Sequence, residues 1–233
     1  DPNTIAQFNF DGIDYPLPQT GQMWLEHELL TNPDTEGFFC ISTSYRNEPN
    51  PIDGRHQKIF PMFEFETKGN MQDMIKLEEE LLTFLGFEKE SVHCTYDGLC
   101  ERYETEILEA EHEERMNKEI SSKLFLKNFP KRTHPFWNME ENPVKCIFHK
   151  VDVILHGQET IGSAERSCDK DVMRWNFLNQ TDGAYANLLF SKFGKERVMK
   201  ELDEFLSHDF FPRFGGGIGM TRMARAMKLE GLI

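Results

Sequence analysis

The chain has 233 residues, of which 39% are hydrophobic and 28% are charged, and its formal net charge is −14 at pH 7. This size suits one globular domain with a sizeable core, so we expect residues 1–233 to form a single domain. An acidic surface repels polyanions, which disfavours general nucleic-acid binding, and no apolar run of the sequence is long enough to span a membrane.

The first third of the sequence alternates turn-forming stretches with short regular elements. Residues 1–18 are rich in Pro, Asn, Asp and Gly, so they are expected to be irregular. A short helix is predicted over residues 23–30. Apolar residues then predict two strands, over residues 38–45 and 57–66, joined by a polar loop over residues 49–54.

Helices and strands follow in turn along the rest of the chain. An amphipathic helix is predicted over residues 71–85, ended by Gly86. The elements predicted after it are a long acidic helix over 99–120, strands over 146–155, 160–166 and 210–216, and helices over 167–178, 196–207 and 220–229. Paired strands together with strands separated by long helices predict an α+β fold, an antiparallel β-sheet flanked by helices.

A glycine run, Gly215-Gly216-Gly217-Ile218-Gly219, stands before the last predicted helix. At a strand-to-helix turn such a run lets the backbone approach a phosphate or a base closely, because no Cβ intervenes. Arg222 would lie one turn into the helix and could point back at that ligand. Glycine-rich turns before helices are common, so the run alone is a weak indication of a nucleotide site.

The two strands of residues 38–66 and their loop carry a mixed set of polar and aromatic residues. This set comprises Arg46, Glu48, Arg55, His56, Phe60, Glu64 and Glu66. Even spacing puts Phe60, Glu64 and Glu66 on one face of the second strand. Arginine suits phosphate oxygens, an aromatic ring can stack on a base, and a carboxylate can bind an ammonium group. The alternative is a solvated hairpin held by salt bridges.

A third segment places two acids on either side of a glycine turn. Asp152 and Glu159 are seven residues apart, with Gly157 between them. Across such a turn they could converge on Mg²⁺, which proteins hold through one or two carboxylates and substrate phosphates. Arg166 follows and could bind a substrate carboxylate or amide. The alternative is that Asp152 merely ends a strand and Glu159 is exposed.

Taken in order, these segments resemble the motifs of class II aminoacyl-tRNA synthetases of the aspartyl/asparaginyl group. Arg46-x-Glu48 with its returning loop resembles motif 2, and residues 215–222 resemble motif 3. The Asp152, Glu159 and Arg166 segment is similar to the metal and substrate segment between them. Asn128-Phe129-Pro130 with Pro135-Phe136-Trp137 resembles the group's "YP…FY" stretch. The resemblance covers residues 19–230.

The resemblance implies an ATP- and Mg²⁺-dependent ligase that converts an amino acid to an aminoacyl-adenylate. Arg46 would hold the α-phosphate, Phe60 would stack on adenine, and Arg222 would cover the other face and reach the γ-phosphate. The implied ATP-binding set is Arg46, Glu48, Arg55, His56, Phe60, Gly217, Gly219 and Arg222, with Arg46 and Arg222 catalytic and with Asp152 and Glu159 holding the metal. The substrate carboxylate attacks the α-phosphate, so catalysis is positioning and charge neutralisation.

Substrate identity depends on residues 19–26. Leu25 stands where aspartyl enzymes have a lysine, and a leucine cannot neutralise a carboxylate. Glu26 would repel a carboxylate but accept a hydrogen bond from an amide NH₂. Asparagine is therefore favoured and aspartate comes next. The implied amino-acid-binding set is Gln22, Glu26, Glu64 and Arg166, and the alternative is an ordinary amphipathic helix with Glu26 exposed.

Departures from the family pattern bear on the role of the chain. No motif 1 is recognisable before Gln19, and the turn-rich residues 1–36 cannot form an anticodon-binding domain. We therefore expect a free-standing paralogue that resembles asparaginyl-tRNA synthetase or the synthetase-related asparagine synthetases. The adenylate could pass to a tRNA acceptor end, to ammonia or to another acceptor, and a catalytically inactive regulatory module is the alternative from another class.

Two further expectations concern assembly and location. The resemblance implies a homodimer without a membrane partner. The five cysteines are scattered and lack C-x-x-C spacing, which disfavours a zinc site or a disulfide scaffold. Reduced thiols in a cytoplasmic protein are the plain interpretation.

Overall fold

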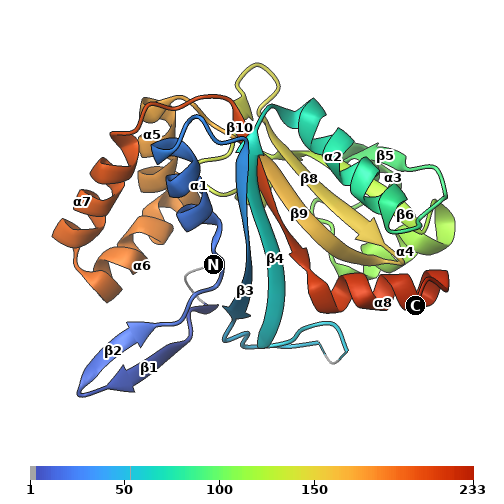
Figure 1. Cartoon of the computed structure of the whole chain (residues 1–233), viewed down its shortest axis with the longest axis horizontal. Coiled ribbons are helices and arrows are strands. Elements are labelled where there is room, and N and C mark those ends of the chain that lie inside the picture. Colours follow the sequence, from blue (N-terminus) through green and yellow to red (C-terminus); the bar gives the residue numbers. More distant parts are fainter. Residues whose placement is uncertain (1–3, 53) are drawn as a thin grey trace.

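The computed structural model describes residues 4–52 and 54–233. Its centre is an eight-stranded sheet in the order β3-β4-β10-β9-β8-β6-β5, with β7 paired to β8 (Figure 1). The strands are β3 (Gly37–Tyr45), β4 (Ile59–Lys68), β5 (Val92–Thr95), β6 (Lys123–Pro130), β7 (Glu141–Asn142), β8 (Ile147–Leu155), β9 (Gln158–Arg166) and β10 (Arg213–Gly219). Every pairing in this sheet is antiparallel except β5 with β6, which confirms the predicted α+β fold.

Some helices cover the sheet, and others form a separate group beside it. They are α1 (Gln22–Thr31), α2 (Met71–Phe84), α3 (Tyr96–Tyr103), α4 (Ala110–Glu119), α5 (Lys170–Asn179), α6 (Ala184–Phe193), α7 (Lys195–Leu206) and α8 (Met220–Glu230), with 3₁₀ turns η2 (Lys131–Thr133) and η3 (Gln180–Gly183). Helices α2 and α8 pack on one sheet face through a large apolar core. Helices α5 to α7 share their own apolar core and lie at the left of Figure 1, whereas α2 and α8 lie at its right.

The alternation on β4 decides which sheet face holds polar groups. Phe63 and Phe65 pack against the core under α2 and α8. Glu64 and Glu66 point to the opposite face, where α1 lies, and both are buried there. The strand therefore carries its carboxylates to a covered face, as its period-two pattern predicts.

The whole glycine run belongs to a strand: the strand predicted to end at Gly216 continues to Gly219, where a turn is predicted. Gly215, Gly216, Gly217 and Gly219 lie within β10, none of them has a positive φ, and α8 begins directly at Met220. The strand is central and paired on both sides. An added Cβ would meet Glu66 Oε1 at 2.0 Å from Gly215 and Met62 Cε at 2.6 Å from Gly217. Glycine is thus needed here because neighbouring side chains lie across the strand.

The acidic helix predicted over residues 99–120 is in fact two helices, α3 and α4. Glu104 caps α3 with φ +54°, in the left-handed region, which ends that helix. The two helices each turn an apolar side, such as Tyr103 and Met116, to one core. A single straight helix could not bury both sides, so packing overrides the continuous helical pattern.

The N-terminal segment, expected to be irregular over 1–18, contains a hairpin. Strands β1 (Gln7–Phe10) and β2 (Ile13–Pro16) pair antiparallel and project from the body of the molecule (Figure 1). Asp11 and Gly12 both have positive φ, as a tight two-residue hairpin turn requires. Residues 1–3 of the expected segment lie outside the described residues.

Two smaller observations complete the fold. Within residues 4–52 and 54–233, no helix has both the length and the apolar character needed to cross a membrane. All five cysteines are free thiols.

Candidate functional site

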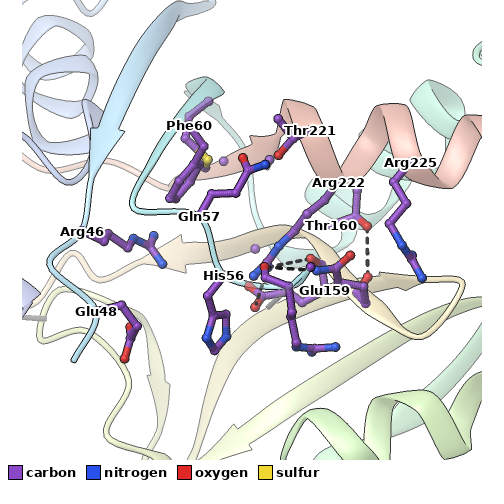
Figure 2. A pocket seen from close by; sticks show the side chains of 17 residues that line it. Arg46, Glu48, His56, Gln57, Phe60, Glu159, Thr160, Thr221, Arg222 and Arg225 are labelled. Carbon is purple, nitrogen blue, oxygen red and sulfur yellow. Dashed lines mark hydrogen bonds and ion pairs between the residues drawn. The ribbon is translucent and has the colours of Figure 1, made fainter. Parts of the chain in front are cut away.

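A cavity of about 410 Å³ opens beside the end of β10 and the start of α8. All eight residues predicted to bind ATP line it: Arg46, Glu48, Arg55, His56, Phe60, Gly217, Gly219 and Arg222. They come from the β3–β4 loop, from β4, from β10 and from α8, so segments far apart in the sequence meet here (Figure 2). We call this space the nucleotide cavity.

Two arginines bound the nucleotide cavity from different elements. Arg46 directly follows β3, and its guanidinium lies 5.3 Å from the centroid of the Phe60 ring. Arg222 projects from the first turn of α8, and its Nη1 donates to the carbonyl oxygen of Glu159 at 2.8 Å. The same nitrogen is 3.6 Å from the Glu159 carboxylate. Figure 2 shows Arg46 and Arg222 on opposite sides of the cavity, with Phe60 on the side of Arg46.

Arg55 is held by an acid that sequence reasoning did not single out. Its guanidinium pairs with the carboxylate of Glu113 on α4 and donates to the carbonyl oxygen of Gly157 at 3.3 Å. Glu113 also accepts from the backbone N–H of Glu159 at 2.8 Å. Burial raises the pKa of the Glu113 carboxyl. The unusual acidity of residues 99–120 was the available signal, but it does not say which glutamate faces the loop.

Asp152 and Glu159 converge over a residue without a side chain. A Cβ added at Gly162 would lie 2.9 Å from Glu159 Oε1 and 3.5 Å from Asp152 Oδ1. The ammonium of Lys150 contacts both oxygens of Asp152, at 2.6 and 2.7 Å. Burial raises the pKa of Asp152 to about 7 despite that ammonium. The pair can offer oxygen ligands to one hard cation.

A metal ion here would need ligands beyond the protein. Among the described residues, no group of three or more His, Cys, Asp and Glu is placed to hold one. Two carboxylates with phosphate oxygens or water completing the shell are a usual arrangement for Mg²⁺. The donor set of Asp152 and Glu159 therefore fits Mg²⁺ that arrives with a phosphate ligand.

A second cavity of about 480 Å³ meets the first at two residues. Arg46 and Glu48 line both cavities. Three of the four residues predicted to bind the amino acid, Gln22, Glu26 and Arg166, line the second one. We call it the amino-acid cavity, and its junction with the nucleotide cavity is at Arg46.

Glu26 is buried, so the alternative of an exposed glutamate is wrong. Arg213 donates to its Oε1 from Nε at 2.9 Å and from Nη2 at 2.5 Å. Asn138, which also lines the amino-acid cavity, donates from Nδ2 to the other oxygen at 2.7 Å. That bond fixes the orientation of the Asn138 amide, and its Oδ1 is buried without a hydrogen-bond partner among the described residues. Glu26 therefore orients the Asn138 amide so that the unpaired atom is its acceptor, Oδ1.

A second buried pair supports Arg166. Its Nε donates to Glu66 Oε1 at 3.0 Å, and its Nη2 bonds both Glu66 and Gln22. Burial raises the pKa of Glu66 to about 7, because Arg166 offsets only part of the cost of desolvation. The guanidinium of Arg166 is thus paired with Glu66 and held in one orientation by Glu66 and Gln22.

Glu64 is the one predicted amino-acid residue that lines neither cavity. It is buried and accepts from Thr20 Oγ1, from the backbone N–H of Gly21 at 2.7 Å and from Ser42 Oγ at 2.5 Å. These donors occupy both carboxylate oxygens. Its contacts therefore fix the turn that begins α1.

Comparisons with known proteins bear on this geometry. The sequence profile of the family described as tRNA synthetases class II (D, K and N) matches residues 4–231. Among curated proteins, none matches the chain significantly. Similar solved structures are asparaginyl-tRNA synthetase from Pyrococcus horikoshii complexed with asparaginyl-adenylate (TM-score 0.75, 18% identity, 96% of this chain and 56% of that one) and aspartyl-tRNA synthetase from Entamoeba histolytica (TM-score 0.69, 18% identity, 90% and 48%).

A further similar structure is asparaginyl-tRNA synthetase from Entamoeba histolytica in complex with asparaginyl-adenylate (TM-score 0.69, 18% identity, 99% of this chain and 57% of that one). At this identity the likeness shows a shared fold. The chain spans about half the length of each of these structures.

Proposed function

Because the chain belongs to the family of class II tRNA synthetases that groups the D, K and N enzymes, we propose that it uses ATP to activate an amino acid as an aminoacyl-adenylate. The observation that supports this most is the junction of the two cavities at Arg46 and Glu48. An adenylate joins a nucleotide to an amino acid through one phosphate. Such a molecule would span both cavities with its phosphate beside Arg46, and two of the similar structures hold asparaginyl-adenylate.

The proposed roles follow from the position of each side chain. Arg46 would donate to the α-phosphate and stabilise the charge that develops as the substrate carboxylate attacks and pyrophosphate leaves. Phe60 would stack on the base, and Gly217 and Gly219 would line the cavity beside the nucleotide. Arg222 would exchange its contact with Glu159 for the outer phosphates. No protein nucleophile is needed, because positioning and charge neutralisation carry the reaction.

We propose that Asp152 and Glu159 hold Mg²⁺ when the triphosphate is bound. The ion would supply positive charge to the phosphates. Lys150 now neutralises Asp152, so it would share this acid with the ion or release it. Arg55 and His56 also line the cavity and would contact the outer phosphates.

Asparagine is the substrate that the amino-acid cavity favours, with aspartate next. The buried atom that lacks a partner there is an acceptor, Asn138 Oδ1. The NH₂ of a side-chain amide would satisfy it, whereas a carboxylate would place an acceptor against an acceptor. Arg166 remains available to the amide oxygen, while Glu66 offsets the guanidinium charge that a carboxylate would need.

Amino-acid-dependent ATP–pyrophosphate exchange tests the proposal. Exchange with asparagine but not with aspartate would support it as stated. Exchange with aspartate, together with AMP formation and asparagine release on adding ammonia, would instead identify an asparagine synthetase. Absence of exchange with all twenty amino acids, from protein with a cooperative melting transition, would favour a regulatory module without catalysis.

Assembly and acceptor are proposed on the same basis. We propose a homodimer, because the family resemblance implies one and because the outer sheet face near the edge strand β3 exposes Phe39 and Ile41 by 70% and 68%. Sedimentation equilibrium of the wild type and of a Phe39→Ser, Ile41→Ser variant would test this surface. For the acceptor, charging of tRNA, reaction with ammonia and transfer to another acceptor can be compared once the activated amino acid is known.

A further inference from the structure

A third cavity, of about 300 Å³, lies apart from the two catalytic cavities. Its walls come from η2, from the start of β8 and from the end of α5 with η3. None of the site residues predicted from the sequence, all of which the structure describes, lines it. Its size is at the lower end of the range for small-molecule sites, roughly 300–1,000 Å³.

Two amide groups in this wall lack hydrogen-bond partners. Asn176 is only 6% exposed, and its Nδ2 has no partner among the described residues. Oε1 of Gln180, one turn further on, is likewise buried and unpaired within the described part of the chain. The Gln180 Nε2 donates to the carbonyl oxygens of His134 and Pro135, both at 3.0 Å, which fixes the orientation of the amide. One donor and one acceptor, from two residues that line the same cavity, are thus left unsatisfied, which is costly unless a ligand or water pairs with them.

An aromatic ring and cationic groups flank these amides. The Trp175 side chain is 54% exposed, and Lys131 Nζ lies 4.7 Å from its ring centroid. Lys131 and Arg132 line the cavity with one acid, Asp182. Each cation also has an acidic neighbour outside the lining: Arg132 contacts Asp97 at 2.5 Å, and Lys131 is 3.8 Å from Glu141. The lining therefore holds two cations and one acid, and acids outside the lining pair with both cations.

We propose that this cavity binds a nucleoside phosphate. Nucleobases carry hydrogen-bond donors and acceptors close together on their edges, which matches the unpaired Asn176 donor and Gln180 acceptor. The base would stack on Trp175, and its phosphate would lie near Lys131. A purely apolar ligand would leave both amides unpaired. A simple anion could satisfy Asn176 but not Gln180, and it would make no use of the indole face.

Calorimetric titration with UMP, GMP and uridine tests the proposal without requiring catalysis. Asn176→Leu keeps the size of the side chain but removes the donor, so nucleotide binding should weaken at least tenfold. Its melting temperature should stay the same or rise, because an unpaired buried group is removed. Trp175→Ala, a change at an exposed side chain, should weaken binding similarly. Lys131→Met should reduce the preference for UMP over uridine.

Asn179→Ala is the matched control within the same cavity. Its Nδ2 bonds the backbone oxygen of Trp175 at 2.8 Å, so the group is already satisfied and its removal should change binding less than threefold. Phe60→Ala controls for the nucleotide cavity and should leave the binding of UMP and GMP unchanged.

Three results would overturn the proposal. One is that neither UMP nor GMP binds. Another is that binding survives both Asn176→Leu and Trp175→Ala, or is lost in Phe60→Ala instead, which would place the nucleotide in the catalytic cavity. The third is a crystal structure from nucleotide-soaked crystals in which water alone bridges Asn176 and Gln180. Loss of ATP–pyrophosphate exchange would contradict the proposed activity but would not affect this test.

Discussion

The nucleotide cavity and the amino-acid cavity use the same residue types but hold their charges differently. In the nucleotide cavity, the Arg222 side chain is 27% exposed and contacts Glu159 at the rim. Beside the amino-acid cavity, Arg166 and Arg213 are at most 5% exposed and are locked to Glu66 and Glu26. An exposed pair can be exchanged for a phosphate at little cost, whereas a buried pair cannot be separated without leaving a charge unpaired.

This difference separates two functions of arginine in one protein. The exposed arginines are available to a charged ligand that comes and goes. The buried arginines form part of the scaffold. Under the proposed function, selectivity at the amino-acid end would depend on Asn138 Oδ1, which has no hydrogen-bond partner among the described residues. Substitutions at the two kinds of arginine should therefore have separable effects on stability and activity.

Arg213→Ala should have the largest effect, on stability. It would leave the buried Glu26 without its cation, which costs about 3–5 kcal/mol for a broken buried pair. The free energy of unfolding from urea denaturation measures this loss. The double variant Arg213→Met, Glu26→Met is the matched control and should recover much of it. A stability change below 1 kcal/mol in Arg213→Ala would contradict the distinction between the two cavities.

Arg222→Ala should affect activity and not the fold. Removal of one charge-stabilising donor from an active site lowers the rate by about 10²–10³-fold. ATP–pyrophosphate exchange measures the rate, and the same protein should unfold within about 1 kcal/mol of the wild type because its pair with Glu159 is partly exposed. Arg225→Ala is a control, since Arg225 lines the same cavity and its guanidinium donates to the carbonyl oxygen of His156 at 3.4 Å. Equal losses in both variants would remove Arg222 from the assigned role.

Glu78 provides a third case, a buried carboxyl group that forms no ion pair among the described residues. It lies on the buried side of α2, and within the described chain neither carboxylate oxygen has a hydrogen-bond partner. Burial raises its pKa to about 8 from an ordinary value near 4.5. In the unfolded chain it ionises first, so its contribution to stability is complete below about pH 4.5 and is lost as the pH rises towards 8.

Glu78→Gln should therefore stabilise the protein in a pH-dependent way. The free energy of unfolding of the variant, minus that of the wild type, should rise by roughly 3 kcal/mol from pH 5 to pH 8. One unit of pKa shift corresponds to about 1.4 kcal/mol. Urea denaturation across this range measures the gain. Glu80→Gln, on the exposed side of the same helix, is the control and should show no such slope. A difference that stays constant with pH would mean that Glu78 is ionised in the folded state.

The sequence predicted the nucleotide cavity better than the amino-acid cavity, for a physical reason. Arg46, Phe60 and Arg222 could be placed because strand alternation and motif order determine where they point. The partners of Glu26 could not be predicted, because Arg213 and Asn138 are brought to it by long-range packing. Glu113 was missed likewise, since the face that α4 turns to the loop depends on the break at Glu104.

Local propensity also misled the interpretation of the glycine run. Glycines before a helix are typical of a turn, and the sequence predicts one directly after Gly216. In the structure, Gly215 and Gly217 lie in a central strand. Glycine is needed at both positions because the side chains of Glu66 and Met62 occupy the space where a Cβ would stand. Such a constraint arises only when the neighbouring strands are in register. It cannot be deduced from a single segment.

Phe60→Ala should have the smallest effect and should sharpen the comparison between the cavities. Phe60 lines the nucleotide cavity but not the amino-acid cavity. Loss of the ring should weaken ATP binding by about 1–3 kcal/mol, the range measured for stacking of a base on an aromatic side chain. Calorimetric titration with ATP and, separately, with asparagine measures both affinities, and only the first should change. Phe60→Tyr keeps the aromatic face and should bind ATP nearly as the wild type does. If Phe60→Ala weakened both ligands equally, the two cavities would act as one site, and the assignment of separate roles to their arginines would fail.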